Sequence, residues 1–168
     1  MKLSIKEMSY AAMLAALSII FYFVPALPTP WGMNLDIIAL PWFIGLFMFG
    51  SAVGFLSMVV GCTVLSFIAA AGWIGMLAKF LASLCLMLPF FFYKNKIVPG
   101  IIGIILRGIV MVFANYYFFL PLWLNMQPAA LMEKFPFWII LLPNVIQSLI
   151  DLGIAEIVYV RLRRMYKG

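Results

Sequence analysis

A few polar side chains lie inside stretches of this chain that are otherwise apolar. Arg107 and Asn115 both belong to the run RGIVMVFANYYFFLPLW, which begins at Arg107. Asn144 and Gln147 lie in a later apolar run, and Lys79 lies in an earlier one. In hydrocarbon an unpartnered amide or charge costs several kcal/mol, so such groups face a bundle interior, a cavity or one another. The chemistry that they offer is hydrogen bonding to a polar molecule or to neighbouring helices.

The sequence lacks the residues that catalysis and metal binding usually need. It has no histidine, which removes the commonest general base and the commonest metal ligand. It shows no nucleophile with a base, no metal-binding cluster and no phosphate-binding Gly-x-x-x-x-Gly-Lys-Ser/Thr loop. We therefore expect neither an enzyme nor a bound cofactor or metal. Cys62 and Cys85 fall within apolar runs and are expected to remain free thiols.

The composition indicates an integral membrane protein. Of the 168 residues, 67% are hydrophobic and 10% are charged, and the mean hydropathy is +1.19. Soluble domains average about 45–50% apolar and about 25% charged residues. The chain cannot bury that much apolar surface by folding on itself, so the bilayer must be its solvent.

At about 20 residues per crossing, the length allows six transmembrane helices in a single all-α domain. The second apolar stretch is short and is expected to lean on its neighbours. Prolines make residues 25–36 a stiff loop between the first two spans. The first span is expected to be retained rather than cleaved as a signal peptide. The expected spans are about 8–24, 37–49, 52–70, 73–93, 100–123 and 137–160.

The basic residues orient the bundle. With six spans, one side of the membrane receives most of the loop and terminal cations, and the other side receives only Lys134. The positive-inside rule then places both termini in the cytoplasm, most naturally at the plasma membrane of a prokaryote. The net charge of +6 reports this topology rather than binding to nucleic acid. The cations on the basic side are Lys2, Lys6, Lys94, Lys96, Arg161, Arg163, Arg164 and Lys167.

The depths of the polar residues predict a pocket that opens to the outside. At about 1.5 Å per residue, Asn115 and Asn144 lie roughly 12 Å below the outer boundary, and Lys79 lies roughly 9 Å below it. Gln147 shares a helix face with Asn144. We expect no acidic residue at this depth. The alternative is that these side chains only join helices to one another.

Arg107 and Asp151 both fall in the inner half of the membrane, and Glu156 lies closer still to the cytoplasm. An ion pair between Arg107 and Asp151 would explain why each is tolerated. We interpret this pair as structural. A proton or ion relay is the alternative, but a single carboxylate without histidine makes a poor relay.

Small residues repeat at intervals of four on the first span, where Ala11 with Ala15 and Ala12 with Ala16 form two parallel rows. Such rows let helices approach closely in lipid, either within this bundle or against a partner. A second row on the third span is expected to pack within the bundle, and it comprises Gly50, Gly54, Ser57 and Gly61. Among the tryptophans, Trp31 lies in the proline-rich loop, where it could cover a ligand.

The chain resembles the substrate-binding S component of energy-coupling factor (ECF) vitamin transporters, especially the riboflavin-type branch. The resemblance covers nearly the whole chain. It rests on the double Ala-x-x-x-Ala of the first span and on the stretches LDIIALPWFIGLFMFGSAVGFL, GWIGMLAKFL, FANYYFFLPLW and LPNVIQSLID.

The resemblance implies six helices, a substrate pocket near the outer surface and a lid formed by residues 25–36. It implies that the alanine face docks on a transmembrane T component driven by two ATPases. Asn115 and Asn144 match the binding asparagines of the family. Riboflavin members carry a lysine near the position of Gln147 and an asparagine near that of Lys79, so these identities are exchanged here. Riboflavin is the leading ligand, and the alternatives are another vitamin or a structural or regulatory membrane subunit.

Overall fold

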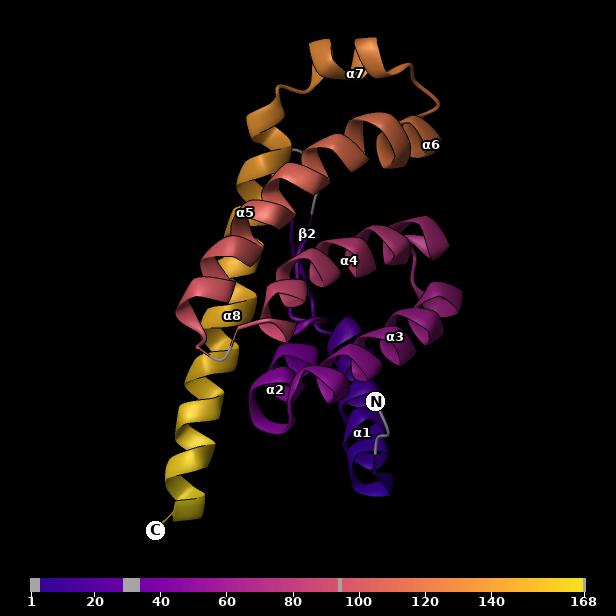
Figure 1. The fold of residues 1–168 in the computed structure, drawn as a ribbon. Coiled ribbons are helices and arrows are strands. Elements are labelled where there is room, and N and C mark those ends of the chain that lie inside the picture. Colours follow the sequence, from indigo (N-terminus) through magenta and orange to yellow (C-terminus); the bar gives the residue numbers. More distant parts are fainter. Residues whose placement is uncertain (1–3, 29–33, 94, 168) are drawn as a thin grey trace.

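The computed structural model describes residues 4–28, 34–93 and 95–167, and nearly all of them are helical (Figure 1). A two-stranded antiparallel ladder pairs Leu27 with Leu35. The α-helices are α1 (Ile5–Tyr22), α2 (Leu40–Phe49), α3 (Ser51–Ile68), α4 (Gly72–Met87), α5 (Ile97–Ala114), α6 (Leu120–Leu124), α7 (Pro128–Lys134) and α8 (Phe137–Lys167). The remaining elements are β1 (Leu27–Pro28), β2 (Asn34–Leu35), a 3₁₀ turn η1 (Leu88–Phe91) and a π-helical turn η2 (Asn115–Phe119).

In the part of the chain that the structure describes, five helical segments are long and apolar enough to cross a membrane, and α2 is a shorter apolar helix. With 10 residues, α2 measures about 15 Å, against about 30 Å for the hydrocarbon core. The division into six spans stays a prediction. The five segments are Ile5–Tyr22, Ser51–Ile68, Gly72–Phe91, Ile97–Leu124 and Phe137–Met165.

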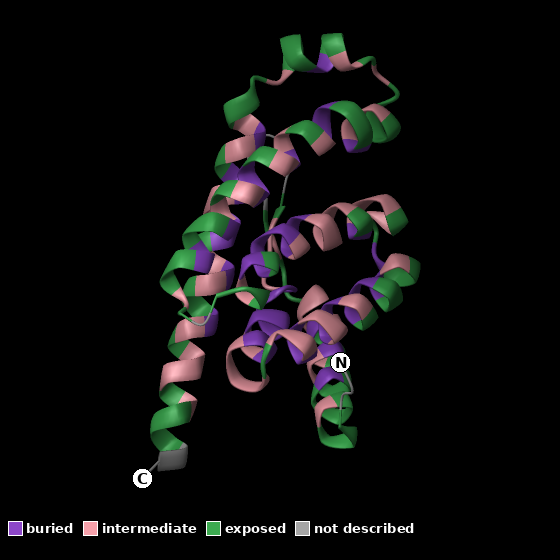
Figure 2. Ribbon diagram, in the orientation of Figure 1, coloured by how far each residue is buried: buried purple, intermediate pink, exposed green. Residues whose placement is uncertain are grey.

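The short helix α2 lies in the middle of the packing. It contacts α1, α3 and α8, and both Trp42 and Phe43 are fully buried. Gly50, with φ of 100°, makes the abrupt turn from α2 into α3 because it carries no Cβ. Figure 2 shows buried residues on α2 and along the contact of α5 with α8, while the outward helix faces are exposed. Since α2 is too short to span the bilayer alone, its neighbours supply the surroundings that its apolar residues need.

Glycines allow the closest helix contacts. A Cβ at Gly54 would lie 2.8 Å from the Trp42 carbonyl oxygen, and one at Gly61 would lie 2.6 Å from Ser18 Oγ. The small-residue row of α3 therefore packs within the bundle against α2 and α1, as expected. On α5, a Cβ at Gly103 would lie 2.5 Å from the Leu86 carbonyl oxygen of α4.

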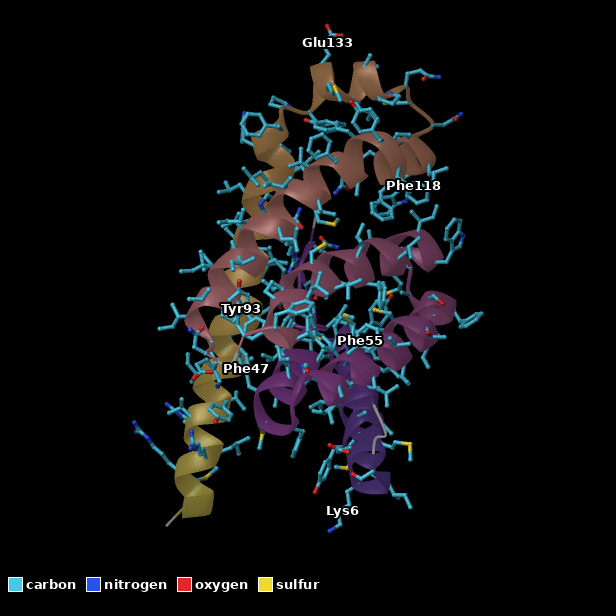
Figure 3. All side chains as sticks on the ribbon, in the orientation of Figure 1. Lys6, Phe47, Phe55, Tyr93, Phe118 and Glu133 are labelled. Carbon is cyan, nitrogen blue, oxygen red and sulfur yellow. The ribbon has the colours of Figure 1, made fainter. Side chains whose placement is uncertain are left out.

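The two ends of the molecule differ. The start of α1 and the end of α8 lie at one end, and α7 lies at the other (Figure 1). Lys6 and Glu133 mark these two ends in Figure 3. With 31 residues, α8 is about 46 Å long, which exceeds the hydrocarbon thickness. The start of α1 and the end of α8 thus lie on the same side of the bundle, as the expected topology requires. That this side faces the cytoplasm stays a prediction.

We expect Gly103→Ala to destabilise the bundle by about 1–3 kcal/mol, because its methyl group would press against the α4 backbone. Gly153→Ala is the matched control on α8, where a Cβ meets no atom within 4 Å. That change should be neutral or stabilising by up to about 1 kcal/mol. Thermal unfolding of the two purified variants in detergent measures the difference, and equal unfolding temperatures would contradict this account of the α4–α5 contact.

Candidate functional site

A cavity of about 1040 Å³ lies inside the bundle, where α4, α5 and α8 meet the segment around β2. It is lined by residues 22–26 at the end of α1 and just beyond it, by the segment around β2, and by the first half of α4. The α5–η2–α6 segment and the first half of α8 complete the lining. Small-molecule sites in proteins usually occupy about 300–1,000 Å³. Apolar side chains form much of the wall, including Ile74, Met76, Met111, Phe119 and Ile140.

The polar residues singled out from the sequence meet at this cavity. Lys79, Asn115, Asn144 and Gln147 all belong to its lining. Their convergence was expected from their depths, and their role in binding stays a prediction. Trp31 lies outside the described residues.

Asn115 lies where the helical hydrogen bonding changes. It is the first residue of the π turn, and the Leu120 N–H donates to its carbonyl oxygen, five residues back. Pro121 explains the wider turn because it has no N–H and its ring would clash with the preceding helical turn. The side-chain Nδ2 of Asn115 donates to the Met111 carbonyl oxygen at 2.7 Å. Such π turns often occur at functional sites.

Asn144 lies next to a proline within the continuous helix α8. Its Nδ2 donates to the Ile140 carbonyl oxygen at 2.8 Å. Pro143 lies inside this helix, so the Ile139 carbonyl loses its helical donor. Ile139 and Pro143 both line the cavity. This backbone acceptor was not among the groups expected from the sequence, although the proline within an apolar run was a usable signal.

Lys79 has an acidic partner, so the expectation of no acidic residue at its depth was wrong. Asp36 Oδ1 lies 2.6 Å from Lys79 Nζ, with 16% and 11% of the two side chains exposed. Asp36 follows directly on β2, which pairs with β1, and both β2 and Asp36 line the cavity. The signal was present in the sequence, because a buried lysine demands a counter-charge and the chain has only 5 acidic residues.

The Gln147 side chain forms two hydrogen bonds with the main chain of Asp36. The Asp36 N–H donates to Gln147 Oε1 at 3.1 Å, and Gln147 Nε2 donates to the Asp36 carbonyl oxygen at 2.7 Å. Gln147 Nε2 also donates to Asp151 Oδ1 at 2.8 Å. The loop before α2 is therefore joined to α8 through one side chain that is 3% exposed.

The expected pair of Arg107 with Asp151 is confirmed. Their closest charged atoms lie 3.1 Å apart, and the side chains are 4% and 0% exposed. Arg107 Nε also donates to Asn144 Oδ1 at 3.3 Å. The separation into an inner ion pair and outer amides does not hold, because the long arginine side chain reaches from one group to the other. Arg107 of α5 and three residues of α8, Asn144, Gln147 and Asp151, therefore form one hydrogen-bonded network.

The alanine rows of α1 separate in the structure. Ala11 and Ala15 are each 1% exposed and face the neighbouring helices, whereas Ala12 and Ala16 are exposed. The two rows lie about 100° apart around a helix, which places one inside the bundle and one on its surface. Within the described parts of the chain, no three His, Cys, Asp or Glu side chains come close enough together to hold a metal ion.

A helical bundle with an apolar-walled cavity and a few convergent polar side chains has the features of a membrane protein with a small-molecule binding site. Comparison with known proteins identifies the family. The family model for the ECF transporter substrate-specific component matches residues 6–163. The chain belongs to this family.

A solved structure agrees with this assignment. The chain is similar, at 26% identity and a TM-score of 0.77, to a structure described as the S component of a bacterial ECF transporter, and the match covers 97% of this chain and 98% of that chain. No curated protein matches the chain significantly. The protein is thus a substrate-binding subunit of an ECF importer, not an enzyme, and it works in the membrane with a T component and ATPases.

We expect Asp151→Leu alone to destabilise the protein by about 3–5 kcal/mol, because it leaves the Arg107 guanidinium buried without its carboxylate. The double variant Arg107→Met/Asp151→Leu should recover much of that loss, since no charge then remains. Unfolding temperatures in detergent test the pair. A double variant no more stable than the single one would contradict the ion-pair explanation.

Proposed function

We propose that this protein captures riboflavin from the outer side of the membrane and presents it to the transporter. The observation on which the proposal depends is the cavity, whose walls are apolar and whose polar side chains gather on α4, α5 and α8. A flavin ring has two apolar faces and one edge with carbonyl oxygens, ring nitrogens and an N–H group. Such a ligand suits a pocket in which a few placed polar groups set orientation.

The binding residues in this proposal are Asn115, Asn144, Gln147 and Lys79. Within the described residues, Lys79 keeps two N–H groups beyond its bond to Asp36, and Asn115 and Asn144 each keep one beyond the bond to their own helix. Both N–H groups of Gln147 are already donated, so Gln147 can offer a ligand only its carboxamide oxygen. The set can therefore bond both kinds of group along the ring edge. Asn144 and Gln147 are held in place by Arg107 and Asp151. A prepositioned set of buried polar groups rejects analogues that leave those groups unpaired.

The proposal includes a topology. Six spans with cytoplasmic termini in a prokaryotic plasma membrane place the cavity toward the outside, where a scarce vitamin arrives. The supporting observation is that the cavity is lined by the end of α1 rather than by its start. In that arrangement the ATPases act from the cytoplasmic side through the transmembrane T component.

We expect Asn115→Ala and Asn144→Ala each to raise the riboflavin Kd by about tenfold or more, because each lost buried hydrogen bond costs on the order of 1–3 kcal/mol. Quenching of flavin fluorescence by the purified subunit measures the Kd. Asn95→Ala is the matched control, since this exposed asparagine lies outside the cavity and accepts a hydrogen bond from the nearby Val98 N–H. Unchanged affinity in both variants would assign the asparagines to helix packing instead.

We propose that the T component docks on the exposed row of α1, Ala12 with Ala16, because the buried row is unavailable to a partner. Ala16→Leu should reduce copurification with the T component by about tenfold or more while riboflavin binding persists, since the added side chain keeps the helices apart.

Ala15→Leu separates docking from packing. This buried position should lose about 1–3 kcal/mol of stability by overpacking, and riboflavin binding should fall with it. Ala130→Leu on α7, an exposed alanine at the other end of the molecule, should change neither measurement. If the Ala16→Leu variant copurifies normally with the T component, the docking face does not include this row of α1.

A further inference from the structure

Asp36 has a fixed position at the edge of the cavity. Its Oδ1 accepts from Lys79 Nζ at 2.6 Å and from the Ile38 N–H at 3.0 Å. Its main-chain N–H and carbonyl are both bonded to the Gln147 carboxamide. Three of these contacts involve neutral groups, so they hold Asp36 in place whether or not a cation is present. These hydrogen bonds therefore keep the Asp36 carboxylate next to Lys79.

Among the described residues, each cation that lines the cavity is paired with a carboxylate. The charged residues in the lining are Asp36, Lys79 and Arg107. Within the described residues Lys79 pairs with Asp36, and Arg107 pairs with Asp151 behind the wall. The local charges of these groups sum to zero.

This pairing bears on the kind of ligand that the pocket accepts. A lysine alone would attract a carboxylate or phosphate through a charge-assisted hydrogen bond. Here an anionic ligand must compete with Asp36 for Lys79 and must also approach the Asp36 carboxylate. A cationic ligand meets the converse difficulty at Lys79. A neutral molecule can use the remaining N–H groups of Lys79 without separating the pair.

We propose that Asp36 is a specificity-determining residue, which neutralises Lys79 and thereby restricts the pocket to ligands without net charge. The inference deepens the proposed function, because it concerns the same pocket. It extends to whichever small molecule binds there, so it can be tested apart from the riboflavin assignment.

The test compares neutral and anionic members of three vitamin pairs: riboflavin with riboflavin 5′-phosphate, nicotinamide with nicotinate, and pantothenol with pantothenate. Titration calorimetry on the purified subunit gives each Kd. For the pair that binds, the wild-type protein should prefer the neutral member by about tenfold or more, as expected when an ion pair must be disturbed. Asp36→Asn keeps the side-chain size and the oxygen that accepts from Ile38 but removes the charge. It should shift the preference toward the anionic member by about tenfold or more.

Two variants serve as controls, and a third replaces Asp36→Asn if that variant does not fold. Asp36→Asn/Lys79→Gln should restore the preference for the neutral member, because the freed cation is then gone. Glu156→Gln should leave the preference unchanged, since it removes the partner of Lys96, 2.6 Å away, outside the cavity. If Asp36→Asn fails to fold, as judged by thermal unfolding without vitamin, Lys79→Gln replaces it. That variant leaves Asp36 uncompensated and should weaken the anionic member by a further tenfold or so.

The outcomes separate the two proposals. An unchanged preference in Asp36→Asn, or a wild-type preference for the anionic member, overturns the role of Asp36. If another vitamin pair follows the expected pattern while neither flavin binds, the riboflavin assignment fails and charge selection stands. If no pair binds at all, both proposals fail.

Discussion

A buried arginine in a membrane bundle must have a partner, and much of this structure is arranged around Arg107. Its guanidinium joins Asp151 and Asn144 of α8, and Asp151 in turn accepts from Gln147. Gln147 holds the main chain of Asp36, whose carboxylate pairs with Lys79 of α4. One line of polar contacts therefore connects α5, α8, the loop before α2 and α4, because hydrocarbon offers no other partner.

The opposite side of the bundle is held together by close packing. Helix α2 is too short to cross the membrane alone and lies among α1, α3 and α8. Gly54 and Gly61 bring α3 against Trp42 and Ser18 at distances that a Cβ would forbid. In lipid such packing replaces the hydrophobic effect as the main attraction between helices. The cavity is placed where this close-packed part meets the polar network.

This division suits a capture subunit. The polar network fixes the amides that we propose as binding groups, since each is already bonded to its own helix or to a neighbouring segment. The row of α1 formed by Ala12 and Ala16 is exposed, as the proposed docking on the T component requires. The proposed binding and docking residues thus lie on different parts of the chain, and transport against a gradient depends on the ATPases of the complex.

The sequence by itself determined the membrane class, the helical fold and the need for an Arg107–Asp151 pair, because these follow from composition and from the cost of an unpaired charge in hydrocarbon. It also placed Asn115 and Asn144 at one level through the constant rise of a helix, and it placed Gln147 on the same helix face as Asn144. Only the tertiary structure decided that Asp36 turns back to Lys79 and that Ala11 and Ala15 are buried. The path of a loop and the rotation of a helix about its axis depend on contacts between segments distant in the chain, which local pattern and helix periodicity leave open.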